Sequence, residues 1–147
     1  MQKQDYGAAE TAFQAAMKLD PNSAEPYNAL AQMYNTQKKF DQAAAMTAEA
    51  LKRGGGSAGG GSPEVTFNQG VTLWNAGKIA EAKAQFEAAV KAKPDYADAH
   101  YWVGMANLNE GKMPEAAAAF ENYLKFAPTG QYAEQVKKLL PQIKPQQ

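Results

Sequence analysis

One sequence pattern occurs twice between Pro63 and Gly130, with an offset of 34 residues. The first copy and the second share their glycine, alanine, phenylalanine and proline positions: Gly70, Gly77, Ala82, Phe86 and Pro94 match Gly104, Gly111, Ala116, Phe120 and Pro128. A period of this length, kept without insertion, is typical of proteins whose units pack only on their neighbours. We therefore expect an array of repeats and not a single-core enzyme domain.

Each copy predicts two helices joined by a tight turn. In the first copy, Ser62 is expected to cap a helix that begins at Pro63, where the missing N–H of proline costs nothing. Gly77 supplies the positive φ that ends this helix. Apolar residues three and four apart predict a second helix over 79–92, which ends before Pro94.

The second copy repeats this arrangement. Asp95 is expected to cap its first helix, Gly111 to form the turn, and Pro114 to open a helix that ends before Pro128. Glycine inside a helix costs roughly 1 kcal/mol relative to alanine. The glycines at 70 and 104 therefore predict that a neighbouring helix crosses there too closely for a side chain.

These residues resemble the tetratricopeptide repeat, whose pattern over 34 positions is matched at the glycine, alanine, phenylalanine and proline positions. The family's signature tryptophan is replaced by Thr66-Phe67 in one copy and His100-Tyr101 in the other. The resemblance implies an all-α fold: a right-handed α-solenoid of about eight helices, arranged as helix hairpins with a C-terminal capping helix.

The first 53 residues follow the same pattern. Residues 5–19 match a second helix alone, and a complete unit follows, with Ser23 as its expected cap. In this unit Thr47 replaces the aromatic residue that the other copies carry as Phe86 and Phe120.

Residues 54–62 read GGGSAGGGS, where the other junction has a short proline-containing turn. Such a composition predicts a flexible tether with a root-mean-square span of roughly 15 to 18 Å. This span permits stacking of the units on either side, and it also permits exchange with a second chain. The sequence leaves open whether the tether is natural or engineered.

Four segments are thus expected: a half repeat and a full repeat over 1–53, the tether over 54–62, two full repeats over 63–130, and a capping helix with a tail over 131–147. The last helix has one apolar stripe, which suits a terminal cap. Pro141 and Pro145 are expected to end it.

Composition excludes several kinds of chemistry. The formal net charge is +0, no cysteine is present, and His100 is the only histidine. A thiolate or two-histidine metal site and a cysteine nucleophile are therefore excluded, and no cofactor, metal or catalytic residue is expected. No basic run favours nucleic acid, and no apolar run reaches the roughly 18 residues that cross a bilayer. The cytoplasm is the default expectation for the chain as given.

The resemblance also implies a binding surface, because in this family the first helix of each unit lines a concave groove that holds peptides or partner helices. Carried over by position, the groove residues here are Asn28, Gln32, Asn35, Phe67, Asn68, Val71, Asn75, Tyr101, Met105 and Asn109. Amide side chains both donate and accept hydrogen bonds, which suits the backbone of an extended peptide. Phe67, Tyr101 and Met105 are the expected apolar anchors.

One family subtype clamps the C-terminal carboxylate of its ligand with basic residues. Asn68 fits one clamp position, but the basic positions hold Asn28, Asp98 and Trp102. A carboxylate clamp is therefore not expected. The alternative role for the aromatic residues of the groove is packing between helices, which is the preferred interpretation for Trp74 and Trp102.

Three functions are weighed. The first is a non-enzymatic module that binds a protein or peptide partner in the groove. The second is a self-associating array, such as a domain-swapped homodimer, because the N-terminal helix has an uncovered stripe at Tyr6, Phe13 and Met17. The third, an enzyme, has no residue pattern in its favour.

Overall fold

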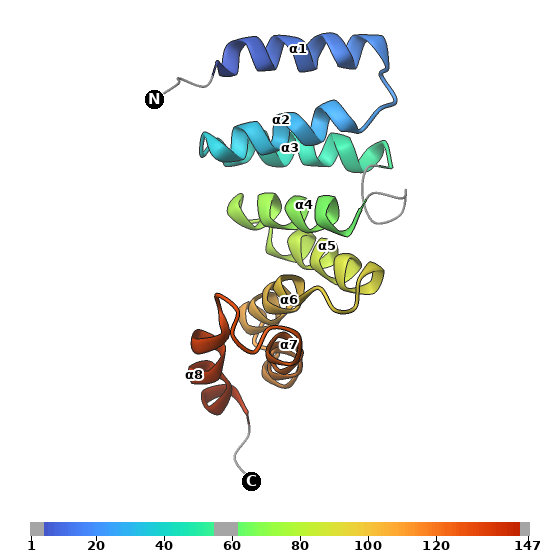
Figure 1. Ribbon diagram of the computed structural model, residues 1–147. Coiled ribbons are helices and arrows are strands. Elements are labelled where there is room, and N and C mark those ends of the chain that lie inside the picture. The colour runs from blue at the N-terminus through green and yellow to red at the C-terminus, as the bar shows by residue number, and fades with distance from the viewer. Residues whose placement is uncertain (1–4, 55–61, 145–147) are drawn as a thin grey trace.

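A computed structural model describes residues 5–54 and 62–144, and within these ranges the chain forms eight α-helices and no strand. The helices are α1 (Tyr6–Leu19), α2 (Glu25–Thr36), α3 (Phe40–Lys52), α4 (Pro63–Asn75), α5 (Ile79–Ala92), α6 (Ala97–Asn109), α7 (Met113–Phe126) and α8 (Ala133–Ile143). Figure 1 shows them stacked in chain order from α1 at one end to α8 at the other. The all-α solenoid predicted from the repeat is confirmed.

Each helix packs on the next along the chain, and α2 also contacts α4 across the predicted tether. Apolar side chains form three clusters, one for each set of neighbouring helices. The first joins α1, α2 and α3, the second joins α4 and α5 with neighbouring residues of α3 and α6, and the third joins α6, α7 and α8. The packing is therefore local, as expected when each repeat contacts only its neighbours.

The helix-interior glycines lie at the crossing of paired helices. A Cβ atom added at Gly70 would lie 2.6 Å from the ring of Phe86, and one added at Gly104 would lie 2.6 Å from the ring of Phe120. Because no Cβ fits at these distances, the close crossing predicted from the two glycines is confirmed.

The turns inside the helix pairs use a left-handed residue. Gly77 and Gly111 have φ values of 79° and 77°. Lys38 occupies the same place between α2 and α3 with φ 61°. A side chain there costs roughly 1 to 2 kcal/mol, so the first full repeat carries strain that its two sister repeats avoid.

Helix capping differs in part from the expectation. Ser62 caps α4 as predicted, with its Oγ accepting from the backbone N–H of Val65 at 3.2 Å. The predicted caps at Ser23 and Asp95 are wrong, because the residues that precede α2 and α6 are Ala24 and Tyr96. The Ser23 hydroxyl accepts only from Glu25 N–H, at 3.3 Å.

The prediction that Pro141 ends the last helix is also wrong, because Pro141 lies inside α8. Pro141 has no N–H to donate to the preceding turn, so α8 lacks one backbone hydrogen bond there. The helix instead ends at Ile143, and the next residue, Lys144, has an extended ψ of 130°, as the residue before a proline prefers. Pro145 itself and most of the predicted tether lie outside the described residues.

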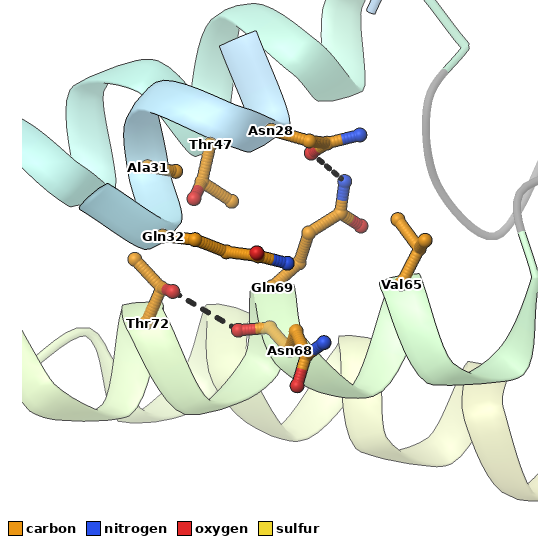
Figure 2. A pocket seen from close by; sticks show the side chains of 8 residues that line it. All are labelled: Asn28, Ala31, Gln32, Thr47, Val65, Asn68, Gln69 and Thr72. Carbon is orange, nitrogen blue, oxygen red and sulfur yellow. Dashed lines mark hydrogen bonds between the residues drawn. The ribbon is translucent and has the colours of Figure 1, made fainter. Parts of the chain in front are cut away.

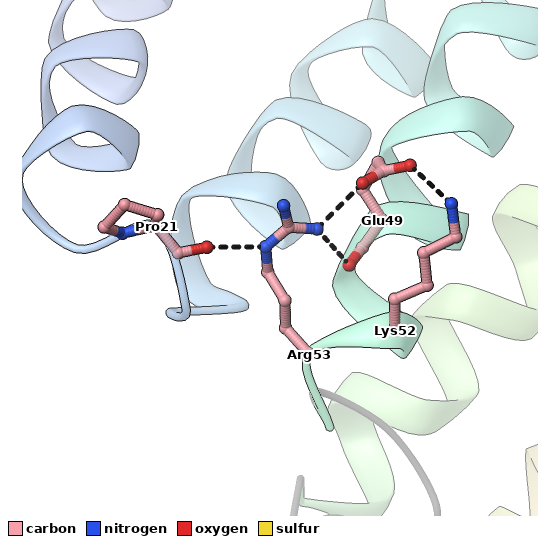
Figure 3. Close-up of polar contacts among 4 residues, drawn as sticks. All are labelled: Pro21, Glu49, Lys52 and Arg53. Carbon is pink, nitrogen blue, oxygen red and sulfur yellow. Dashed lines mark hydrogen bonds and ion pairs between the residues drawn. The ribbon is translucent and has the colours of Figure 1, made fainter.

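Arg53 fixes the point from which the chain leaves α3 (Figure 3). Its Nε donates to the carbonyl oxygen of Pro21 at 2.8 Å, which joins the end of α3 to the loop between α1 and α2. Its Nη1 donates to both the backbone and the carboxylate of Glu49, each at 2.8 Å, and the guanidinium stacks 4.0 Å above the ring of Tyr27. Hydrogen bonds from Arg53 and then Lys52 lower the pKa of Glu49.

Candidate functional site

Amide side chains join the first helices α2 and α4. Gln69 Nε2 donates to Asn28 Oδ1 at 2.9 Å, and Asn75 Nδ2 donates to Asn35 Oδ1 at 2.9 Å. Three of the predicted groove residues, Asn28, Asn35 and Asn75, therefore bond across the interface between repeats. An amide group has more donors and acceptors than one bond uses, so these residues can still bond to a ligand.

Two adjoining hollows lie along this interface. The smaller is lined by Asn28, Ala31, Gln32, Thr47, Val65, Asn68, Gln69 and Thr72, which Figure 2 shows converging from α2, α3 and α4. The larger has a volume of about 280 Å³ and is lined by Gln32, Asn35, Thr36, Asn68, Val71 and Thr72. The two hollows share Gln32, Asn68 and Thr72, so they form one continuous site, which we name the α2–α4 groove.

The α2–α4 groove is polar and uncharged. Of the ten predicted groove residues, it contains Asn28, Gln32, Asn35, Asn68 and Val71. Gln32 and Asn68 are exposed, whereas Val71 is half-buried. Every lining side chain is an amide, a hydroxyl or a small apolar group. The groove can therefore form hydrogen bonds along a ligand but offers no ion pair from its lining.

Tyr101, an expected apolar anchor, lies in the interior of the described conformation. Tyr101 is 4% exposed because Tyr132, just before α8, stacks on its ring with centroids 3.9 Å apart. Burial raises the pKa of the Tyr101 hydroxyl. Met105 on the same helix packs against this cluster, and Asn109 is exposed at the end of α6.

Phe67 also packs internally. Its ring lies 5.6 Å from that of Phe86 and 5.0 Å from that of Tyr96. The ring remains half-buried. Its contacts favour the alternative role, packing between helices, over that of a ligand anchor.

Trp74 and Trp102 pack between repeats, as expected, with ring centroids 5.1 Å apart. His100 is 7% exposed, donates from Nε2 to the carbonyl oxygen of Pro94 at 2.7 Å and stacks on Phe126. These contacts give His100 a structural role. Within residues 5–54 and 62–144, no group of three acidic or histidine side chains could hold a metal ion.

Six lining residues were not predicted from the sequence: Ala31, Thr36, Thr47, Val65, Gln69 and Thr72. Gln69 and Thr72 lie on α4 beside the predicted Asn68, one position and four positions further along the chain. Thr47 comes from a second helix, α3, and not from the first helices that line the family's groove. The signal for Thr47 was its departure from the phenylalanine of the sister repeats.

The helix hairpins, their glycine crossings and the stacked arrangement define a repeat protein of the α-solenoid class. Residues 1–58 and residues 67–131 each match a family described as the tetratricopeptide repeat. The chain belongs to this family, as the sequence resemblance predicted. A comparison with curated proteins returns no match.

Solved structures of similar fold include several tetratricopeptide proteins. The crystal structure of MamA aligns over 94% of this chain and 78% of its own, with a TM-score of 0.80 and 22% identity. The Arabidopsis OM64 TPR domain aligns over 82% of this chain and 95% of its own, with a TM-score of 0.68 and 19% identity. The first TPR of Spaghetti (RPAP3), bound to the HSP90 peptide SRMEEVD, aligns over 84% of this chain and 94% of its own, with a TM-score of 0.68 and 22% identity.

At these identities the likeness shows the fold alone. The match to the tetratricopeptide family supports a protein-interaction module. Among the helices of the described ranges, none is both long and apolar enough to cross a membrane.

Proposed function

We propose that the chain is a non-enzymatic interaction module that binds an extended peptide in the α2–α4 groove. The observation that carries this proposal is the continuous row of amide and hydroxyl groups between α2 and α4. An extended peptide has a backbone N–H and C=O at every residue, and amide side chains can pair with both. Val71 supplies a small apolar contact in the same groove.

The expected peptide is uncharged at the residues that enter the groove. The relative described above is bound to a peptide with three acidic residues near its end, SRMEEVD. The lining of the α2–α4 groove contains no cation to pair with such residues. Burying an unpaired carboxylate there would be costly, so we expect selection against acidic peptides.

The test is a selection of random peptides displayed against the full chain, followed by affinity measurements on the selected sequences. Gln32→Ala and Asn68→Ala should each weaken binding about tenfold, because each removes hydrogen bonds from an exposed groove side chain. Asn122→Ala is the matched control, an exposed amide on the second helix α7, and should leave affinity unchanged. Equal losses from Asn68→Ala and Asn122→Ala, or a failure to select any peptide, would contradict the proposal.

Self-association is a second candidate, and α1 favours it. The expectation of an uncovered stripe on α1 is wrong in part, because Tyr6, Phe13 and Met17 pack against the cluster of α2 and α3. No residue of α1 is fully buried, however, and a hollow of about 280 Å³ beside it is lined mainly by the apolar side chains of Phe13, Ala16, Pro26 and Ala29. The proposed occupant is a second copy of the chain. Light scattering over a concentration series tests this: a dimer that Phe13→Asp dissociates would support it, and a monomer at all concentrations would exclude it.

A further inference from the structure

The three helix junctions of this solenoid have the same geometry but different contents. At the α4–α5–α6 junction, Phe86 crosses Gly70 and stacks on Trp102 with centroids 5.7 Å apart and planes 18° apart. At the α6–α7–α8 junction, Phe120 crosses Gly104 and is fully buried in one cluster with Val136. Aromatic rings thus fill both junctions.

The α2–α3–α4 junction lacks the aromatic rings at the equivalent places. Ala31 replaces the glycine, Thr47 replaces the phenylalanine, and Asn68 lies where the next junction has Trp102, 34 residues further on. The threonine occupies less space than a phenyl ring, and the asparagine less than an indole. The smaller hollow of the α2–α4 groove lies between these residues (Figure 2).

This hollow is small and has an unpartnered polar group in its wall. Its volume of about 10 Å³ admits one group the size of a water molecule. The Thr47 side chain is 0% exposed, and its hydroxyl has no hydrogen-bond partner within residues 5–54 and 62–144. A buried hydroxyl without a partner loses roughly 1 to 3 kcal/mol.

Other threonines in helices avoid this loss. Thr11, Thr36 and Thr72 each donate to the carbonyl oxygen four residues earlier, at 3.0 Å. Such a bond to the preceding turn is the usual one for a helical threonine. The Thr47 hydroxyl does not form it, and the Thr47 side chain is part of the lining of the hollow (Figure 2).

We propose that this hollow, the Thr47 site, receives the hydroxyl group of a serine in the bound peptide. This inference rests on the proposed peptide-binding function. A hydroxyl fits the volume, and it both donates and accepts, so it can pair with the Thr47 hydroxyl. A methyl group would leave Thr47 unpaired, an aromatic ring does not fit, and a carboxylate would find no cation in the lining. The adjoining larger hollow shares Gln32, Asn68 and Thr72 with this site, so a peptide backbone that lies there would have the site beside it.

The test uses peptides selected on the full chain, each resynthesised with serine, alanine or valine at the position that the selection enriches. The wild-type protein should bind the serine form about tenfold more tightly than the alanine form. Thr47→Val keeps the shape but removes the hydroxyl, so it should reduce this ratio to below about twofold while the alanine form binds as before.

A second variant tests the geometry. Ala31→Gly combined with Thr47→Phe copies the glycine and phenylalanine of the sister repeats, so the ring should fill the Thr47 site. This variant should fold and should bind serine and alanine forms equally. If Thr47→Val fails to fold, Thr47→Ala gives the same comparison of ratios.

The outcomes separate the two proposals. If peptides depend on Asn68 but show no serine preference, or keep that preference in Thr47→Val, the Thr47 site is wrong and the peptide-binding proposal stands. If no selected peptide depends on Asn68, both proposals are wrong. A serine preference that only the Thr47 variants remove supports both.

Discussion

The α2–α3–α4 junction and the α4–α5–α6 junction are built on the same repeat but have different interiors. In the latter, Phe86, Trp74 and Trp102 fill the space between repeats with aromatic rings. In the former, Thr47 and two pairs of amides take their place, and a polar groove remains. The comparison indicates that one repeat geometry serves either to stabilise the array or to bind a ligand, depending on a few positions at the crossing.

The largest expected effect is the loss of a junction ring. Phe86→Ala or Phe120→Ala should destabilise the protein by about 3 to 5 kcal/mol, because each ring is fully buried against a glycine and a cavity would remain. Urea unfolding followed by circular dichroism measures this. Thr47→Val is the matched change at the polar junction and should be neutral or stabilising, since it removes an unpartnered hydroxyl. A large loss from Thr47→Val would show that the polar junction is as tightly packed as the aromatic ones.

The next effect comes from the glycines beneath these rings. Gly70→Ala and Gly104→Ala should each cost about 1 to 3 kcal/mol by overpacking, although alanine is the better helix former. Ala31→Gly, at the equivalent place in the polar junction, should cost only about 1 kcal/mol through helix propensity. Thermal and urea unfolding of the three variants would measure these changes in the free energy of unfolding. Stabilisation by Gly70→Ala would contradict the close crossing.

A smaller change in stability is expected from the turns inside the helix pairs. Lys38→Gly should stabilise the protein by about 1 kcal/mol, because it places glycine at the positive φ that Gly77 and Gly111 already occupy. Gly111→Lys is the reciprocal control and should destabilise by a similar amount. If both variants have the wild-type urea midpoint, the strain assigned to Lys38 is absent.

The smallest effect concerns the bonds between Arg53 and Glu49. The hydrogen bonds to Arg53 and Lys52 lower the folded-state pKa of Glu49 below its usual value of 4.5. A lowered carboxyl pKa contributes stability that is complete above the usual pKa and is lost as the pH falls towards the folded-state value. The stability difference between wild type and Glu49→Gln should therefore be present at pH 7 and disappear in acid. A difference that is independent of pH would mean that the carboxylate charge is not involved.

Much of the fold could be predicted from the sequence because each repeat specifies itself locally. Gly77 and Gly111 mark turns, and Gly70 and Gly104 mark close crossings, since in each case only glycine fits the geometry. The end of α8 was less predictable because the helix continues past Pro141, although proline there removes a backbone hydrogen bond and crowds the preceding turn.

The site could be predicted only in part. Helix position alone placed Asn28, Gln32 and Asn68 together, because first helices of neighbouring repeats lie side by side. Position could not show that Tyr132 covers Tyr101, since that contact depends on how the capping segment turns after α7. The role of Thr47 depends on the volume left by three substitutions together, which no single residue reveals.

The most direct test of the central claim is the backbone amide spectrum of the protein titrated with a selected peptide. A ligand in the α2–α4 groove should shift the resonances of Gln32, Asn68 and Thr72, which line both hollows, and leave those of Met105 and Asn109 on α6 unchanged. Shifts centred on α6, with the α2–α4 residues unaffected, would contradict the assignment of the groove.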